Sequence, residues 1–334
     1  MIANTARATQ GAIPATGTSE VTVRAIAFVA AHKPAAEALG MALADLTPDP
    51  DAFAVALRRG LASLADPEYH AGAERIAPGI GLTHGVRWPL IDAVSRALLQ
   101  ATRNDPATPL LFVADRLLRE PELESTWFAF HLLEWTMATE TERTWQLLRR
   151  AARGSGDWIT VDSLAHPYGS GIAAEPYRWA ELEQLVYSPS RWERRLVGST
   201  IATMAHTGRR GDRDPEVAHR ALPLLGQLMG DAEPEVQKAL SWAYRSLTAV
   251  DMPATVAALR AETERAAGAE DGHRAWVIRD SLVKLDPATA ERLRDRLSGI
   301  RKRPGAPSTS DASLAALRFG DLPDPAIHPE SPLA

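Results

Sequence analysis

The chain has 334 residues and a formal net charge of −5, with 45% hydrophobic and 24% charged residues, which are ordinary proportions for a soluble globular protein. It contains no cysteine, and this excludes disulfides, thiolate zinc sites, iron–sulfur clusters and cysteine nucleophiles. No stretch reaches the roughly 20 apolar residues of a membrane span, so we expect a cytoplasmic protein without membrane contact.

Residues 1–20 are rich in Ala, Thr and Gly, show no apolar periodicity, and predict a disordered N-terminal arm. Residues 301–334 are rich in Pro and Ser and predict a C-terminal tail. We expect residues 21–300 between them to form one domain.

Helix starts within this domain are marked by an acidic residue followed by proline. The pairs are Asp49-Pro50, Glu120-Pro121, Asp214-Pro215 and Asp286-Pro287. An acidic N-cap accepts hydrogen bonds from free backbone amides, and proline in the first turn has no amide hydrogen to leave unpaired. Apolar residues at three- and four-residue spacing follow, and no alternating β-branched runs occur. The sequence therefore predicts an all-α fold.

Acidic helices that also carry arginine recur at about 40 residues, which is the period of HEAT-like repeats. This spacing predicts a HEAT-like helical-repeat solenoid with a concave face suited to a long ligand such as DNA. A generic helical scaffold would produce the same pattern.

The distribution of charge bears on that ligand. Residues 143–245 carry 14 Lys/Arg and 12 Asp/Glu, whereas the rest of the chain carries 23 and 30. A negative net charge argues against nucleic-acid binding, which depends on neutralising phosphates. The more basic middle of the chain keeps such binding open.

Three segments combine aromatic and charged residues at helical spacing. They contain, in order, Trp158 and Asp162; Trp192, Arg194 and Arg195; and Lys238, Trp242 and Arg245. Residues four apart share one face of a helix. The 37 positions from Trp158 to Arg195 and the 47 from Arg195 to Trp242 are each close to one helical pair. We therefore expect these side chains to lie next to one another on one wall of the solenoid.

These segments resemble the AlkD-like family of bacterial DNA alkylation repair enzymes. Trp158 and Asp162 match the family's Trp-x-x-x-Asp pair, and Trp192 and Arg195 match its Trp-x-x-Arg motif. Its Lys-Ala-(Ile/Leu)-x-Trp-x-x-Arg motif is matched by residues 238–245. The resemblance covers about residues 85–250 and includes the turn Gly85-Val86-Arg87-Trp88-Pro89 before a helix. This chain has Asp157 where the family often has a second Trp, and Tyr69 is a candidate for the family's cleft tyrosine.

The resemblance implies a DNA glycosylase of base excision repair that hydrolyses the N-glycosidic bond of cationic purines such as 3-methyladenine and 7-methylguanine. It implies a monomer that binds duplex DNA containing alkylated purines and uses no cofactor. A metal is not expected, because the nine histidines form no His-Glu-x-x-His motif.

The same resemblance implies roles for individual residues. Asp162 would stabilise the positive charge that develops on the sugar and orient the attacking water. Trp158 and Trp242 would attract that cation through their electron-rich rings. Arg195 would bind a phosphate near the lesion. The further candidates for DNA contact are Lys238, Arg245, Arg194 and Trp192.

Other interpretations stay open. Tryptophans of helical proteins usually pack in the core, Asp162 could cap a helix, and Arg194 and Arg195 could form a solvated face. The substrate could be a small methyl lesion or a bulky N3 or N7 adduct, as in self-resistance to a DNA-alkylating natural product. A non-catalytic helical-repeat adaptor that binds DNA or protein is the alternative function.

Overall fold

The computed structural model describes residues 20–76, 81–207 and 213–316. Within these ranges the chain forms sixteen α-helices and two short 3-10 helices, and the only extended pairing described is two isolated β-bridges. The predicted all-α class is confirmed. None of the described helices combines the length and the hydrophobicity that a bilayer span requires. The predicted N-terminal arm up to residue 19, and the predicted tail beyond residue 316, lie outside the described residues.

The helices stack in two layers. The inner layer contains α1 (Glu20–Ala44), α4 (Trp88–Ala101), α6 (Leu123–Thr136), α8 (Trp158–Ala174), α10 (Arg191–Met204), α12 (Pro234–Leu247) and α14 (Gly272–Ser281). The outer layer contains α2 (Pro50–Ser63), α5 (Thr108–Leu117), α7 (Thr141–Gly154), α9 (Trp179–Leu185), α11 (Pro215–Leu228), α13 (Met252–Ala269) and α15 (Pro287–Arg296). The remaining elements are α3 (Pro67–Ile76), η1 (Pro176–Arg178), η2 (Leu282–Lys284) and α16 (Asp311–Ala316).

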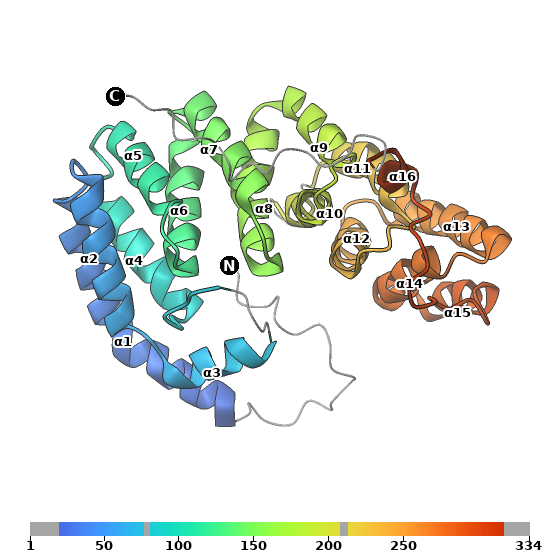
Figure 1. Cartoon of the computed structure of the whole chain (residues 1–334), viewed down its shortest axis with the longest axis horizontal. Helices are drawn as coiled ribbons and strands as arrows, with labels where there is room; N and C mark the ends of the chain where they lie inside the picture. Colours follow the sequence, from blue (N-terminus) through green and yellow to red (C-terminus); the bar gives the residue numbers. More distant parts are fainter. Residues whose placement is uncertain (1–19, 77–80, 208–212, 317–334) are drawn as a thin grey trace.

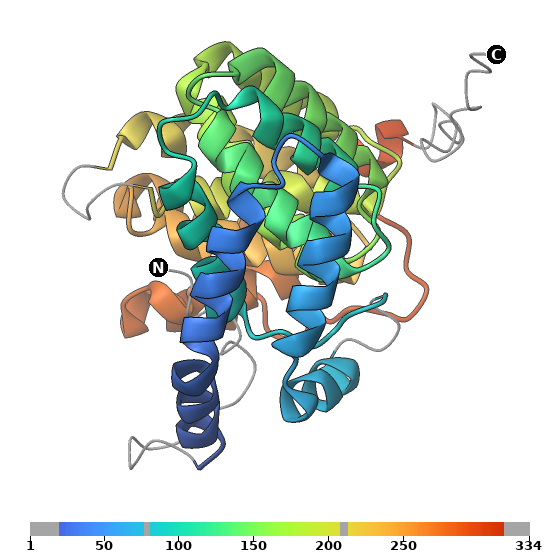
Figure 2. The same ribbon diagram turned by 90° about the vertical axis from the view of Figure 1, so that its left-hand side faces the viewer.

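Successive helical pairs pack against each other along the chain. In the inner layer, α8 contacts α6 and α10, and α12 contacts α10 and α14. The stack is curved, with the outer layer along the outside of the curve and the inner layer along the inside (Figure 1). Figure 2 looks at the N-terminal end, where α1 and α2 lie side by side. One cluster of buried apolar side chains fills the space between the layers. This arrangement is the predicted helical-repeat fold, and its inner surface consists of the inner-helix faces that point away from the core.

Three of the four acidic-proline pairs begin helices as predicted. Asp49, Asp214 and Asp286 each precede the first residue of a helix, and each carboxylate accepts a hydrogen bond from a backbone amide of the first turn. The capping interaction thus accounts for the starts of α2, α11 and α15.

The prediction was wrong for the fourth pair, Glu120-Pro121, which does not start a helix. The helix α6 begins at Leu123, two residues after Pro121, and its N-cap residue has no side-chain capping bond. The Glu120 carboxylate instead pairs with Arg58 and Arg116 of neighbouring helices. The Glu120 side chain therefore forms ion pairs with neighbouring helices and does not provide the cap for α6 that the local pattern predicts.

The turn before α4 depends on a glycine and a buried glutamate. Gly85 has a φ of +79°, and an added Cβ would lie 2.5 Å from the Cβ of His70. The fully buried Glu124 carboxylate accepts hydrogen bonds from the amides of Gly85 and Val86 at 2.9 and 3.2 Å. These contacts hold the turn so that α4 begins at Trp88, as the sequence motif predicts.

Candidate functional site

Asp162 lies in the second turn of α8, on the inner surface of the stack. Neighbouring residues such as Leu164 and Tyr168 are buried in the core, whereas the side chain of Asp162 is 23% exposed. Asp162 is not the helix cap. That position belongs to Asp157, whose carboxylate accepts a hydrogen bond from the amide of Thr160 at 2.8 Å. The Asp162 carboxylate is thus free to interact across the inner surface.

Both oxygens of Asp162 are held by the adjacent helix α10. Arg195 donates from Nε to Oδ1 at 3.1 Å and from Nη2 to Oδ2 at 2.8 Å. The hydroxyl of Ser199, one turn further along α10, donates to Oδ1 at 2.6 Å. A bidentate guanidinium pair restricts the orientation of a carboxylate more than a single contact does. Asp162 is therefore a fixed negative charge that still reaches the surface.

Arg195 extends this arrangement to the next inner helix, α12. Its Nη1 donates to the backbone oxygen of Glu235 at 2.7 Å and to Glu235 Oε2 at 3.1 Å. The other carboxylate oxygen of Glu235 accepts from Lys238 Nζ at 3.0 Å. Asp162, Arg195, Glu235 and Lys238 thus form a chain of alternating charges across α8, α10 and α12, which we call the Asp162 network.

Exposure separates the two cations of the Asp162 network. The side chain of Arg195 is only 5% exposed, whereas that of Lys238 is 56% exposed. Arg195 directs its donors at protein carboxylates and a carbonyl, so it does not present the free guanidinium that phosphate binding requires. Lys238 does have a cation at the surface.

A glycine allows α10 and α12 to approach closely enough for these contacts. A Cβ added to Gly198 would lie 2.8 Å from the carbonyl carbon of Ala239, which is closer than real Cβ atoms come to backbone. Gly198 lies between Arg195 and Ser199 in sequence, so the close helix approach and the network share one turn of α10.

The model of a family described as DNA alkylation repair enzyme matches residues 57–285. The chain belongs to this family. Family membership gives the protein a role in DNA repair and implies that it binds DNA. The match contains the whole Asp162 network. No curated protein matches the chain.

The three candidate tryptophans of this repair protein, Trp158, Trp192 and Trp242, lie in different surroundings. The Trp158 ring centroid is 6.0 Å from the guanidinium carbon of Arg195, at the edge of the Asp162 network. Trp242 and Trp192 are partly buried and pack against the core. The guanidinium of Arg191 lies 4.9 Å from the Trp192 ring centroid. Trp158 is thus the aromatic residue most directly associated with Asp162.

Arg245 belongs to a second polar group, between α12 and α14. Its guanidinium pairs with the Asp280 carboxylate, and the Ser241 hydroxyl donates to the same oxygen at 2.6 Å. Arg245 therefore lies on the same helix as Lys238, but its charge is paired with Asp280.

The structure does not bring Arg194 to the Asp162 network. Consecutive residues of a helix point about 100° apart, so Arg194 faces away from Arg195. Its guanidinium is buried, donates to Asp231 at 2.7 Å, and donates to the carbonyls of Ser188 and Pro189 at 2.8 and 2.9 Å. Arg194 thus connects α10 to loops of the protein, and DNA cannot contact it without local unfolding.

His166 follows Asp162 by one helical turn on α8. Burial lowers the pKa of His166 below its ordinary value of 6.5, while the charge of Asp162 acts in the opposite direction. The imidazole is therefore neutral at pH 7 and adds no positive charge beside Asp162.

Among the described residues, no group of three or more His, Asp or Glu side chains is arranged to hold a metal ion.

Tyr69, the candidate for the family's cleft tyrosine, lies on α3, where the Arg87 guanidinium is 5.1 Å from its ring centroid.

Ser199 and Glu235 belong to the site but were not predicted from the sequence. Ser199 is four residues after Arg195, and Glu235 is three residues before Lys238. Helical spacing places both on the correct faces, but only the structure shows which side chains meet between helices.

Proposed function

We propose that this protein is a DNA glycosylase that hydrolyses the N-glycosidic bond of cationic alkylated purines, such as 3-methyladenine and 7-methylguanine, in base excision repair. The observation that carries the proposal is the Asp162 carboxylate. Arg195 and Ser199 fix its orientation on the inner surface, and part of it stays exposed. Membership of a DNA alkylation repair family supports DNA as the ligand.

The chemistry follows from where charge develops. Breaking the bond between base and deoxyribose builds positive charge on the sugar, and a carboxylate fixed beside it stabilises that charge and orients water. Alkylation at N3 or N7 gives the purine a positive charge before the reaction, so the base leaves without being protonated. One carboxylate, Asp162, therefore suffices, and the mechanism needs no general acid.

The neighbouring residues support Asp162 in distinct ways. Arg195 and Ser199 are positioning residues, because their hydrogen bonds fix the carboxylate before substrate arrives. Trp158, with Trp242 on α12, favours the cationic nucleotide through its ring face. Lys238 is the phosphate contact, since its ammonium group is the exposed cation of the Asp162 network. The partner is duplex DNA containing alkylated purines, bound by a monomer.

A second substrate class is a purine that carries a bulky N3 or N7 adduct. Such adducts are cationic in the same way, so the mechanism applies to them without change. What they add is size, and release assays on small and bulky lesions in parallel rank the two classes.

The deciding experiment is incubation of the protein with methylated duplex DNA, followed by chromatography of the released bases. We expect release of 3-methyladenine and 7-methylguanine, and no release of uracil from a uracil-containing duplex. DNA binding without release of any base would overturn the glycosylase proposal and would favour a non-catalytic adaptor.

A further inference from the structure

Residues 301–316, which we call the C-terminal segment, follow α15 and lie outside the part of the chain that matches the family. The segment folds back over the body, and its short helix α16 contacts α11. It also crosses the loops that precede α12 and α14. The segment therefore lies outside the family match and packs against α11 and the loops before α12 and α14.

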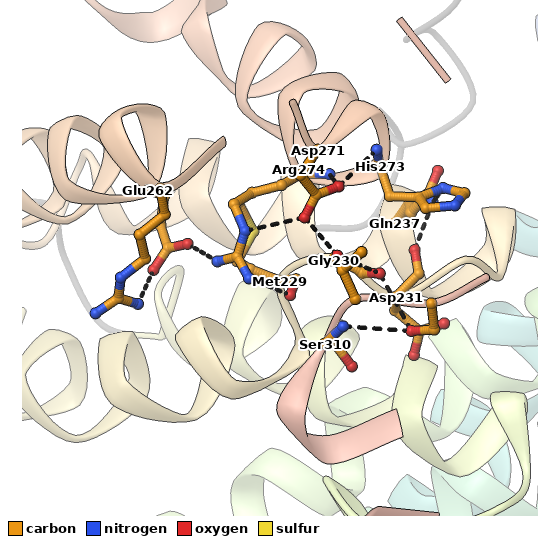
Figure 3. A network of polar contacts seen from close by, with 12 residues as sticks. Met229, Gly230, Asp231, Gln237, Glu262, Asp271, His273, Arg274 and Ser310 are labelled. Carbon is orange, nitrogen blue, oxygen red and sulfur yellow. Dashed lines mark hydrogen bonds and ion pairs between the residues drawn. The ribbon is translucent and has the colours of Figure 1, made fainter. Parts of the chain in front are cut away.

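Polar contacts attach the segment to the body. The Thr309 amide donates to the Gly230 carbonyl at 2.9 Å. The Ser313 hydroxyl donates to Asp231 Oδ2 at 2.8 Å. Asp231 is almost fully buried and also binds Arg194. Figure 3 shows Ser310 of the segment beside Asp231 and Gly230. The segment is thus connected to α10, the helix that carries Arg195.

These attachments place Lys302 beside the Asp162 network. Lys302 Nζ donates to Gln237 Oε1 at 2.7 Å and lies 4.5 Å from the Trp276 ring centroid. Gln237 directly precedes Lys238 in the sequence. Burial lowers the pKa of Lys302, and the charge of Lys238 acts in the same direction.

Two exposed arginines flank Lys302. The only bond described for the Arg301 guanidinium is to the adjacent carbonyl of Ile300, at 3.2 Å. Arg303 approaches Glu270 only to 4.0 Å, and both side chains are at least 80% exposed. Arg279 on α14 is also close, because its guanidinium donates to the carbonyl of Ile300, the residue before Arg301, at 2.7 Å.

The ion pairs described for Lys238, Arg301, Lys302 and Arg303 involve two carboxylates. Glu235 contacts Lys238, and Glu270 contacts Arg303 weakly. Asp271 is buried and pairs with Arg274, so it does not neutralise the segment. A concentration of uncompensated cations raises the local concentration of a polyanion. Because these cations continue from Lys238, a polyanion bound at the Asp162 network would extend over them.

We propose that the C-terminal segment is a second DNA-contacting element, in which Arg301 and Arg303 bind phosphates of the duplex whose lesion lies at Asp162. The inference rests on the proposed function in taking duplex DNA as the ligand. It goes further by assigning DNA binding to a segment outside the family match. Phosphate contacts carry no sequence information, so the segment strengthens binding to damaged and undamaged DNA alike.

The test compares the double variant Arg301→Ala/Arg303→Ala with the wild type. Affinity for undamaged duplex DNA is measured by fluorescence anisotropy at salt concentrations from low to physiological. The slope of log affinity against log salt should become shallower by about 2, because each phosphate contact contributes about 0.9. Affinity near 0.1 M salt should fall at least about tenfold on the same basis.

The matched control is Arg59→Ala/Arg260→Ala, which removes the same charge from exposed positions on the outer helices α2 and α13. We expect its slope to equal that of the wild type. Thermal unfolding of each variant verifies that the fold is intact. Equal losses in both double variants would show an effect of net charge and overturn the inference.

The outcomes also separate this inference from the proposed function. An unchanged slope for Arg301→Ala/Arg303→Ala, with salt-dependent binding and base release by the wild type, would overturn the inference alone. Failure of the wild type to bind DNA would overturn both.

Discussion

Arg195 and Asp162 form a bidentate ion pair between α10 and α8, with nitrogen–oxygen distances of 3.1 and 2.8 Å. The same guanidinium is bonded to Glu235 of α12 and is almost fully buried. This pairing changes the role that the sequence motif implied for Arg195. Because its donors are directed at two carboxylates, we propose that Arg195 positions Asp162 and that phosphate binding falls to other residues.

Replacing Arg195 should therefore reduce base release more than DNA affinity. Arg195→Lys keeps the charge but loses the bidentate geometry, so release at saturating protein should fall by about 10- to 100-fold, the equivalent of a charged hydrogen bond. Arg195→Ala should lose more. Single-turnover release of 7-methylguanine, measured beside DNA affinity, checks this. Weakened DNA binding with an unchanged single-turnover rate would show that Arg195 binds phosphate and does not position Asp162.

Lys238→Ala should show the opposite behaviour. Lys238 is the exposed cation of the Asp162 network, so its removal should make the slope of log affinity against log salt shallower by about 1. Release at saturating protein should stay within a few-fold of the wild type. A loss of release that high protein concentration does not restore would show that Lys238 acts in the chemical step.

Trp158→Ala and Trp242→Ala should each slow release by about 2- to 30-fold, since a contact between an aromatic face and a cation contributes about 0.5–2 kcal/mol. The loss should be larger for Trp158, whose ring lies beside Arg195. The corresponding Phe variants should recover part of the rate. If Trp158→Ala released 7-methylguanine at the wild-type rate, the aromatic contribution would be excluded.

The protein should lose stability in acid through His131. Burial lowers the pKa of His131 below 6.5, while Asp92 opposes and His166 and Arg96 add to the shift. The unfolded chain then binds more protons than the folded one as pH falls through 6.5. Stability is fully present above that pH and declines below it, down to the folded pKa.

Thermal unfolding measured between pH 7 and pH 5 tests this expectation. His131→Phe retains a ring that can pack near Trp88, whose centroid lies 5.2 Å from the imidazole. Its melting temperature should fall less over this pH range than that of the wild type. Parallel declines for the two proteins would assign the acid sensitivity to other groups.

Local signals were sufficient to predict much of the fold. Asp49, Asp214 and Asp286 cap helices because capping involves only neighbouring residues. Glu120 does not follow the same rule because Arg116, four residues earlier, and Arg58 of α2 both bind its carboxylate. The pairing with Arg58, 62 positions away in the sequence, is not visible in any local pattern.

The site shows the same limit. Motif spacing brought together Trp158, Asp162, Arg195 and Lys238, but it could not separate Arg194 from its neighbour Arg195. Both are buried, and only the tertiary fold shows that Arg194 pairs with Asp231 and Arg195 with Asp162. Composition likewise indicated only a Pro/Ser-rich stretch after residue 300. The contacts of Thr309 and Ser313 with loop residues about 80 positions earlier depend on the tertiary fold.

The most direct test of the account is single-turnover release of 7-methylguanine by Asp162→Asn. The Asn side chain has the same shape, and its single amide oxygen can still accept from Arg195 Nε and the Ser199 hydroxyl, so the fold and DNA affinity should persist. Asp157→Asn is the matched control, because it makes the same change on the same helix and Asn caps as well as Asp. We predict a loss of about 100-fold or more for Asp162→Asn and a wild-type rate for Asp157→Asn. A wild-type rate for Asp162→Asn would contradict the central claim that this carboxylate stabilises the sugar cation.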